Sequence, residues 1–124
     1  MNGQYHAGEK VEARLNFLHG DRVREVTATF VHAEDPDTEF HLSGTPEEQV
    51  ATEGAGYTYW RVVLSGEITT EDKLGEYRCE AVEAEYPGRR KVAFGSVPDV
   101  GFQITEENIQ PPEVVDWEWG AGSR

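Results

Sequence analysis

The sequence has one cysteine, Cys79, in 124 residues, so no disulfide can form within the chain and its apolar core must hold the fold. We expect Cys79 to be a small buried apolar side chain and not a reactive thiol. No apolar run approaches the length of a membrane span, and the first residues lack the basic start and apolar stretch of a signal peptide. These absences predict a cytoplasmic protein if Met1 is the native start. If the chain is cut from a longer precursor, an extracellular location stays open.

Basic residues are also scarce, because 11 Lys and Arg stand against 24 Asp and Glu and leave a net charge of −13. Phosphate backbones and anionic lipids repel such a chain, so we expect neither nucleic acid nor a membrane as a partner. Solubility alone explains an acidic surface, although basic partners and cations stay open. The sequence has no G-x-S-x-G elbow, no H-E-x-x-H helix and no phosphate-binding glycine loop, so it offers no catalytic residues and we expect no enzyme.

The chain does contain many short stretches in which apolar and polar residues alternate. In residues 75–81 the side chains of Tyr77 and Cys79 fall on one face and charged side chains on the other, which is typical of a strand with one buried face. Similar stretches lie at residues 11–17, 23–32, 40–42, 57–64, 90–94 and 100–104, with Trp60 on the core face of its strand. Turn signals separate them about every 8 to 12 residues, which predicts a sandwich or a barrel. We therefore expect one β domain over residues 10–105, an N-terminal segment over 1–9 and a tail over 106–124.

The stretch after residue 75 also predicts a bulge and a hairpin. The apolar phase shifts by one residue, so we expect a β-bulge near residues 81–82. Pro87 and Gly88 favour a type II turn with a two-residue loop. That loop would place Glu85 opposite Arg90, an opposite-charge pair that supports the register.

Two short helical turns are expected between the strands. Residues 45–48 combine a threonine cap, a proline and a glutamate in the pattern of a helix start. A second helical turn is expected to begin at Thr69 or Thr70. Glycines at positions 54 and 56 limit the first helix to one or two turns.

Asp72, Gly75, Tyr77 and Cys79 resemble the D-x-G-x-Y-x-C run that opens the sixth strand of immunoglobulin-like sandwiches. Residues 11–104 are also similar to the immunoglobulin-like modules of bacterial proteins. The resemblance implies an all-β fold, an Ig-like antiparallel β-sandwich of about seven strands with one or two short helical turns. It also implies a tyrosine corner, in which Tyr77 is buried and its hydroxyl bonds to the backbone between residues 65 and 74.

The acidic turn that follows the second expected strand is the candidate metal site. Hard cations bind several oxygens, and Glu34, Asp35 and Asp37 could begin a calcium shell. Zinc would instead use His32 and His41 with one carboxylate. A solvated turn explains the same residues, so we expect no cofactor and keep calcium as the first alternative.

Four aromatic side chains are the candidates for a ligand or partner site. Tyr57 and Tyr59 share one face of their strand, and Trp117 and Trp119 share one face of the tail if the tail is extended. Exposed rings on a sheet can stack on sugars or cover a partner surface, whereas packed rings form an outer core. We therefore expect a non-enzymatic binding or interaction module. A carbohydrate-binding module is the first alternative, and a small metal-dependent protein or enzyme is the second.

The tail is too apolar for a disordered acidic end, because it carries Val114, Val115 and two tryptophans. Pro111 and Pro112 would hold it extended. We expect it to dock on protein as a strand, with its own domain favoured over a dimer partner. The chain is accordingly expected to be a monomer, or a dimer formed through its tail.

Overall fold

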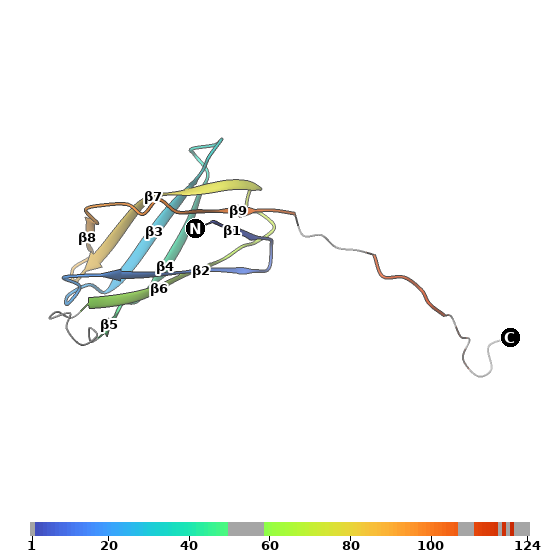
Figure 1. Cartoon of the computed structure of the whole chain (residues 1–124), viewed down its shortest axis with the longest axis horizontal. Coiled ribbons are helices and arrows are strands. Elements are labelled where there is room, and N and C mark those ends of the chain that lie inside the picture. The colour runs from blue at the N-terminus through green and yellow to red at the C-terminus, as the bar shows by residue number, and fades with distance from the viewer. Residues whose placement is uncertain (1, 50–58, 107–110, 117, 119, 121–124) are drawn as a thin grey trace.

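The structure is a computed structural model that describes residues 2–49, 59–106, 111–116, 118 and 120. These residues form an all-β fold, in which nine strands make one continuous sheet (Figure 1). The strands are β1 (Asn2–Tyr5), β2 (Lys10–Phe17), β3 (Glu25–His32), β4 (Glu39–Gly44), β5 (Glu47–Gln49), β6 (Tyr59–Glu67), β7 (Gly75–Tyr86), β8 (Arg90–Ala93) and β9 (Gly101–Ile104). The described part of the chain contains no helix long and apolar enough to cross a membrane.

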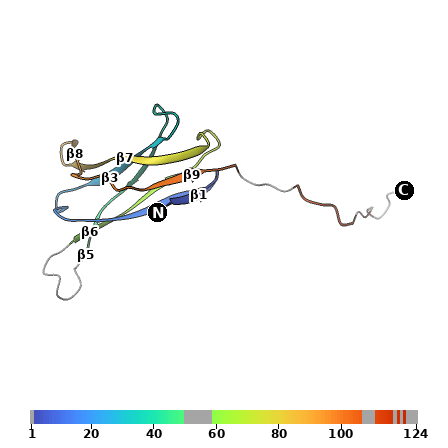
Figure 2. The same cartoon turned by 45° about the horizontal axis from the view of Figure 1, so that its top comes forward.

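The sheet is mixed, and its strands neighbour one another in the order β1-β9-β7-β3-β4-β6-β2. Outside this path, β8 pairs with β7 and β5 pairs with β6. β1 and β9 are parallel, with Asn2 opposite Gly101 and Tyr5 opposite Ile104, whereas the other described pairings are antiparallel. The sheet curls until its two end strands, β1 and β2, lie on the same side of the molecule, which gives a nearly closed barrel (Figures 1 and 2).

The core fills the inside of this curled sheet. Alternate residues of β3 and β6 point inward, and Val26 is 0% and Val62 1% exposed. The ring of Phe102 stacks on the ring of Tyr77 with 5.4 Å between centroids and meets Phe30 edge-on. These aromatic contacts join β3, β7 and β9 into one unit.

Most of the strands expected from alternation are present, but the described residues form nine strands and not about seven. β1 lies within the segment that was expected to precede the domain. The prediction of a helix at residues 45–48 is wrong, because Glu47–Gln49 forms β5 and places Glu47 opposite Arg61 of β6. Backbone pairing with β6 therefore overrides the local capping pattern. The second expected helix is a single turn, in which the Asp72 N–H donates to the Thr69 carbonyl at 3.2 Å.

The β-bulge expected in β7 is present, centred one residue before the expected position. Thr29 lies opposite Ala81 and Phe30 lies opposite Cys79, so Glu80 is an extra residue in its strand. The bulge returns the apolar side chains of β7 to the core after the sequence shifts phase.

The hairpin between β7 and β8 differs in register from the prediction. A loop of three residues, 87–89, joins the strands, so Glu85 lies opposite Lys91 and not opposite Arg90. The last two residues of the loop have φ angles of 86° and 61°. A type II turn alone fits the twist of a hairpin poorly, and the extra left-handed residue corrects that twist.

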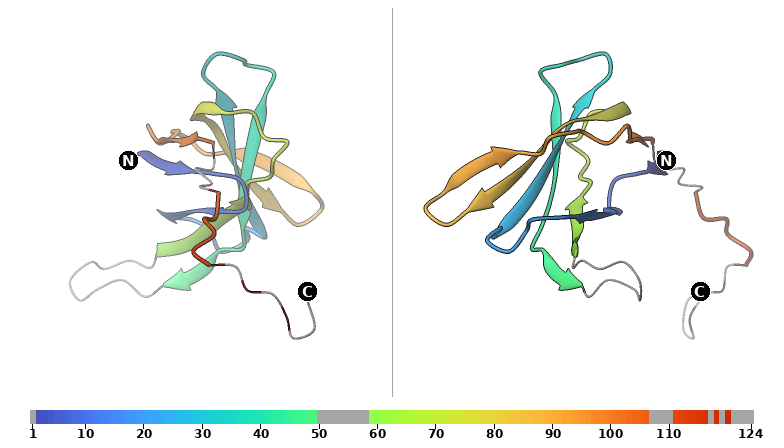
Figure 3. Two further views of the ribbon diagram at one scale, coloured as in Figure 1. Left: turned by 90° about the vertical axis from the view of Figure 1, so that its right-hand side faces the viewer. Right: turned by 60° about the vertical axis from the view of Figure 1, so that its left-hand side comes forward.

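Tyr77 and His32 tie two loops to the core. Tyr77 is 1% exposed and its hydroxyl donates to the Lys73 carbonyl at 2.7 Å, which are the burial and the bond expected from the sequence. His32 is 4% exposed and meets the Tyr77 ring edge-on. Its Nδ1 accepts the Glu34 N–H at 3.0 Å, so Nε2 carries the proton and donates to the Leu74 carbonyl at 2.8 Å. These bonds anchor the β3–β4 turn, which projects from one end of the barrel (Figure 3).

Candidate functional site

A groove runs between the two end strands of the sheet, where the barrel stays open. Its volume is about 730 Å³, within the range of ~300–1,000 Å³ that is typical of ligand sites. Most of the residues along it are apolar. They are Gly3, Tyr5, Val11, Ala13, Leu15, Ala28, Phe30, Leu42, Val63, Leu64, Cys79, Val82, Pro98, Val100, Gly101 and Phe102, and Glu12 and Arg14 complete the lining.

The groove is open because no described strand pairs with the outer edge of β2. Val11, at the start of β2, is 3% exposed, whereas Ala13, Leu15 and Phe17 on the same face are only half-buried. In an antiparallel strand, every second residue points its backbone N–H and C=O away from its partner. The free edge of β2 therefore adds a row of backbone donors and acceptors to an apolar groove.

The rim of the groove on β2 is more basic than the rest of this acidic chain. β2 carries Lys10, Glu12 and Arg14, two basic side chains and one acidic. Lys10 and Glu12 form an exposed ion pair at 3.7 Å. Arg14 forms no ion pair with any residue that the structure describes. A negatively charged segment would therefore meet a favourable field along this edge.

Cys79 lies half-buried in the wall of the groove. Burial raises the pKa of the Cys79 thiol, and the negative charge of Glu80 raises it further. The thiol therefore stays protonated at neutral pH and contributes apolar surface to the groove. It is also the one thiol in the sequence, so chemical labelling can report on this groove alone.

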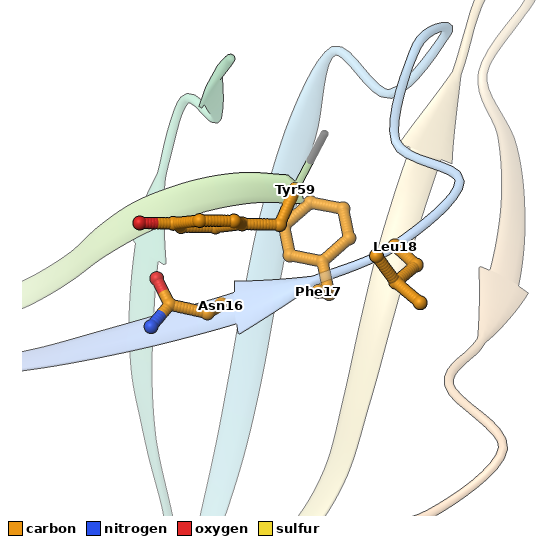
Figure 4. Close-up of a pocket in the computed structure, with 4 residues that line it drawn as sticks. All are labelled: Asn16, Phe17, Leu18 and Tyr59. Carbon is orange, nitrogen blue, oxygen red and sulfur yellow. The ribbon is translucent and has the colours of Figure 1, made fainter. Parts of the chain in front are cut away.

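Tyr59 lies at a second, smaller hollow at the far end of β2. The hollow has a volume of about 280 Å³, and Asn16, Phe17 and Leu18 line it with Tyr59 (Figure 4). The half-buried Tyr59 ring lies beside the Asn16 amide, whose oxygen accepts a hydrogen bond from Arg61 at 3.1 Å. Tyr57, the other candidate of this strand, lies outside the described residues.

The candidate metal residues do not converge. His32 points into the core with both ring nitrogens hydrogen-bonded, and His41 is exposed beside Glu39 on the outer face of β4. Asp35 accepts bonds from the Thr38 hydroxyl at 2.7 Å and from the Lys73 ammonium at 3.2 Å.

The other two acidic residues of this turn, Glu34 and Asp37, are exposed. Within the described residues, no three His, Cys, Asp or Glu side chains are grouped as a metal site would require.

The tail leads away from the barrel in an extended conformation (Figure 1). Its described residues are exposed, with Val114 at 74% and Val115 at 96%. The structure therefore shows these two valines away from the domain on which the tail was expected to dock. Trp117 and Trp119 lie outside the described residues.

The sequence did not point to the groove between β1 and β2. The alternation of Ala13, Leu15 and Phe17 is that of an ordinary core face. It borders a groove because β1 pairs with β9, about a hundred residues along the chain, instead of with β2. No local pattern in the sequence carries that choice of partner.

Comparison with known proteins yields no relative for this chain: no protein-family model, curated protein or solved structure matches it.

Proposed function

We propose that this chain is a non-enzymatic binding module that holds an apolar guest in the groove between β1 and β2. The observation that carries the proposal is the groove itself, about 730 Å³ with mostly apolar walls. A buried apolar cavity of ~150 Å³ already binds benzene, so this groove has room for a guest of several such groups. Covering the half-buried side chains of β2 would contribute about 25 cal/mol for each Å² of apolar surface removed from water.

The test is a titration of the chain with an uncharged dye that fluoresces in apolar surroundings. An uncharged dye is needed because the net charge of −13 would repel an anionic one. We expect saturable binding that is lost in Ala13→Trp, since the larger side chain fills the groove. Ala93→Trp is the matched control, because Ala93 is exposed at the end of β8 and does not line the groove.

Cys79 supplies a second readout that needs no substitution. A guest in the groove should slow the reaction of the Cys79 thiol with a neutral thiol reagent, because it covers the wall in which the thiol lies. Dye binding that is unchanged in Ala13→Trp and leaves Cys79 equally reactive would place the guest elsewhere. The absence of saturable binding, at protein concentrations at which the chain is a single copy, would overturn the proposal.

We also infer that the fold is a variant of the immunoglobulin-like sandwich. Strands β9, β7, β3 and β4 follow the order G-F-C-C′ of one sheet of such sandwiches, and β6 and β2 follow the order E-B of the other. β4 meets β6 through one described residue pair, Ser43 and Ser65, so the sheet nearly divides into two layers there. In an experimental structure, these layers should pack face to face about 10 Å apart. Strands spaced evenly around a round barrel would contradict the inference.

Sugar binding at the smaller hollow is a second candidate function. The observation in its favour is the Tyr59 ring beside the Asn16 amide, because an aromatic face next to a hydrogen-bonding group suits a sugar ring. The test is binding to an array of glycans, repeated with Tyr59→Ala. Ala13→Trp separates the two candidates, since it should remove dye binding and leave sugar binding intact.

A further inference from the structure

We propose that the guest of the groove between β1 and β2 is the tail of a second copy of this chain, bound as an added strand on the free edge of β2. The segment is residues 113–119. This inference rests on the proposed function, because it takes the groove as a binding site and names its occupant. Two copies that exchange tails would form a closed, two-fold symmetric dimer.

The tail has the sequence of a strand with one apolar face. Val115, Trp117 and Trp119 alternate with the acidic residues at positions 116 and 118. In an extended segment the three apolar side chains point to one side, so they would enter the groove together. The backbone of the segment would then pair with the unused donors and acceptors of β2, which is how extended peptides add to sheet edges.

The exposure and direction of the tail favour a second copy over the chain's own barrel. Val114 is 74% and Val115 96% exposed, and the tail leads away from the barrel (Figure 1). Pro111 and Pro112 favour an extended backbone just before the segment. The eight residues 105–112 would span up to about 25 Å at the 3.1 Å per residue of such a segment, so the tail can reach a neighbouring molecule.

Charge along the groove fits the same occupant. Residues 105–124 carry five acidic side chains and one basic, whereas β2 carries two basic and one acidic. With its apolar face in the groove, the segment would point its acidic face outward beside Arg14 of β2. Two chains of −13 also repel each other, and salt screens that repulsion. Salt screens the attraction between the acidic tail and Arg14 as well, so the two effects oppose each other.

The first experiment measures the mass of the full chain by analytical ultracentrifugation over a series of concentrations and salt. We expect the wild-type chain to approach twice its mass of 13.9 kDa. Val115→Asp should return it to the mass of one copy, because that side chain would enter the groove. Val114→Asp is the matched control: it adds the same charge one residue away, on the outward face, and should leave the dimer in place.

The second experiment uses a synthetic peptide of residues 111–121 and the full-length Val115→Asp variant, whose own tail is disabled. The peptide should bind saturably, displace the apolar dye and slow the modification of Cys79 by a thiol reagent. A peptide with aspartate in place of Val115 should do none of these.

Each other outcome overturns part of the idea. A wild-type chain that stays a single copy, with a melting temperature lowered by Val115→Asp, would mean that the tail binds its own barrel. A single copy with no such loss, and no peptide binding, would mean that the tail is not the guest. Dye binding would in that case show that the groove still works for another guest. Loss of dye binding as well would overturn the proposed function itself. Equal effects of Val114→Asp and Val115→Asp would contradict binding as a strand.

Discussion

The imidazole ring of His32 lies against the backbone of Gly75, and a Cβ atom at position 75 would collide with Nε2 of that ring. Gly75 also has a φ angle of 132°, a conformation that residues with a side chain rarely adopt. Two independent constraints, a backbone angle and a neighbouring ring, therefore require glycine at the first position of β7. The same nitrogen of His32 donates to the Leu74 carbonyl, so the contact couples β3 to the start of β7.

Gly75→Ala should lower the free energy of unfolding by about 2–4 kcal/mol, because it adds backbone strain and displaces a hydrogen-bonded buried ring. Urea denaturation measures the loss. Gly8→Ala is the matched control, since Gly8 has a φ angle of 92° but open space around it. That variant should show the strain alone, about 1 kcal/mol. Equal losses in the two variants would mean that His32 moves aside without cost.

Tyr77→Phe should lower the free energy of unfolding by about 1–2 kcal/mol, because the Lys73 carbonyl loses the hydroxyl that donates to it at 2.7 Å. Tyr5→Phe is the control. Tyr5 is half-buried, and its hydroxyl makes no hydrogen bond within the described chain, so little change is expected there. A Tyr77→Phe variant as stable as the wild type would show that this bond does not hold the β6–β7 connection.

The contribution of Asp35 to stability should depend on pH. The Thr38 hydroxyl, the Lys73 ammonium and the Asp37 N–H hold the pKa of the Asp35 carboxyl below its ordinary value of 3.8. Because folding lowers this pKa, the stabilisation is present above the unfolded-state value and is lost as the pH falls through the folded-state value. Asp35→Asn should therefore be less stable than the wild type at neutral pH, and the two should converge as the pH falls through the folded-state pKa of Asp35.

Urea denaturation at a series of pH values measures this convergence. Asp37→Asn is the control, because the Asp37 side chain makes no hydrogen bond or ion pair within the described residues. A gap between Asp35→Asn and the wild type that stays constant down to strongly acidic pH would contradict the assignment.

Repulsion between acidic residues should limit stability on the outer face of the sheet. Glu25 and Glu85 lie directly opposite each other on β3 and β7. Glu25→Lys should raise the free energy of unfolding by about 0.5 kcal/mol, and it should weaken the stabilising effect of sodium chloride. Glu113→Lys makes the same charge change in the exposed tail and should have a smaller effect.

Melting temperatures measured over a series of sodium chloride concentrations test the effect of Glu25→Lys, and the same measurement in calcium chloride tests calcium. Calcium chloride at matched ionic strength should add nothing beyond sodium chloride, because Lys73 already pairs with Asp35. An extra stabilisation that disappears when Asp35 and Asp37 are both changed to Asn would show that this turn holds the cation.

The sequence predicted those parts of the fold that depend on local burial. Alternation marked β2, β3, β4, β6, β7 and β9, since a half-buried strand must alternate whatever its partner is. The stretch at residues 90–94 was also predicted, and it forms β8, whose residues are exposed. The bulge in β7 could also be predicted, because a phase shift in the apolar residues of a strand requires an extra residue. The pairing of β5 with β6, which places Glu47 opposite Arg61, could not be predicted. The local capping pattern at residues 45–48 suggested a helix instead.

The candidate site was harder to predict for the same reason. Val100 and Leu15 come to line one groove only through the order of the strands, which depends on contacts far apart in sequence. The acidic turn resembled a metal site because its residues are adjacent in the chain, yet His32 faces inward and His41 outward. Adjacent residues in a strand necessarily point to opposite faces. His32 follows the buried Ala28 and Phe30 at the same spacing in β3, whereas His41 stands between the buried Phe40 and Leu42 of β4. The alternation of each strand could therefore have placed one histidine inward and the other outward in advance.

The parallel pairing of β1 with β9 determines which strands can pair first while the chain is being synthesised. Asn2 pairs with Gly101, so β1 leaves the ribosome about a hundred residues before its partner exists. At roughly 5–20 residues per second, the first strand waits for about 5–20 s without a neighbour. One side of the groove is therefore completed last, after the β2–β6 and β3–β4 pairs can already have formed. During that interval the apolar side chains that β9 will cover are exposed, which favours association between nascent chains.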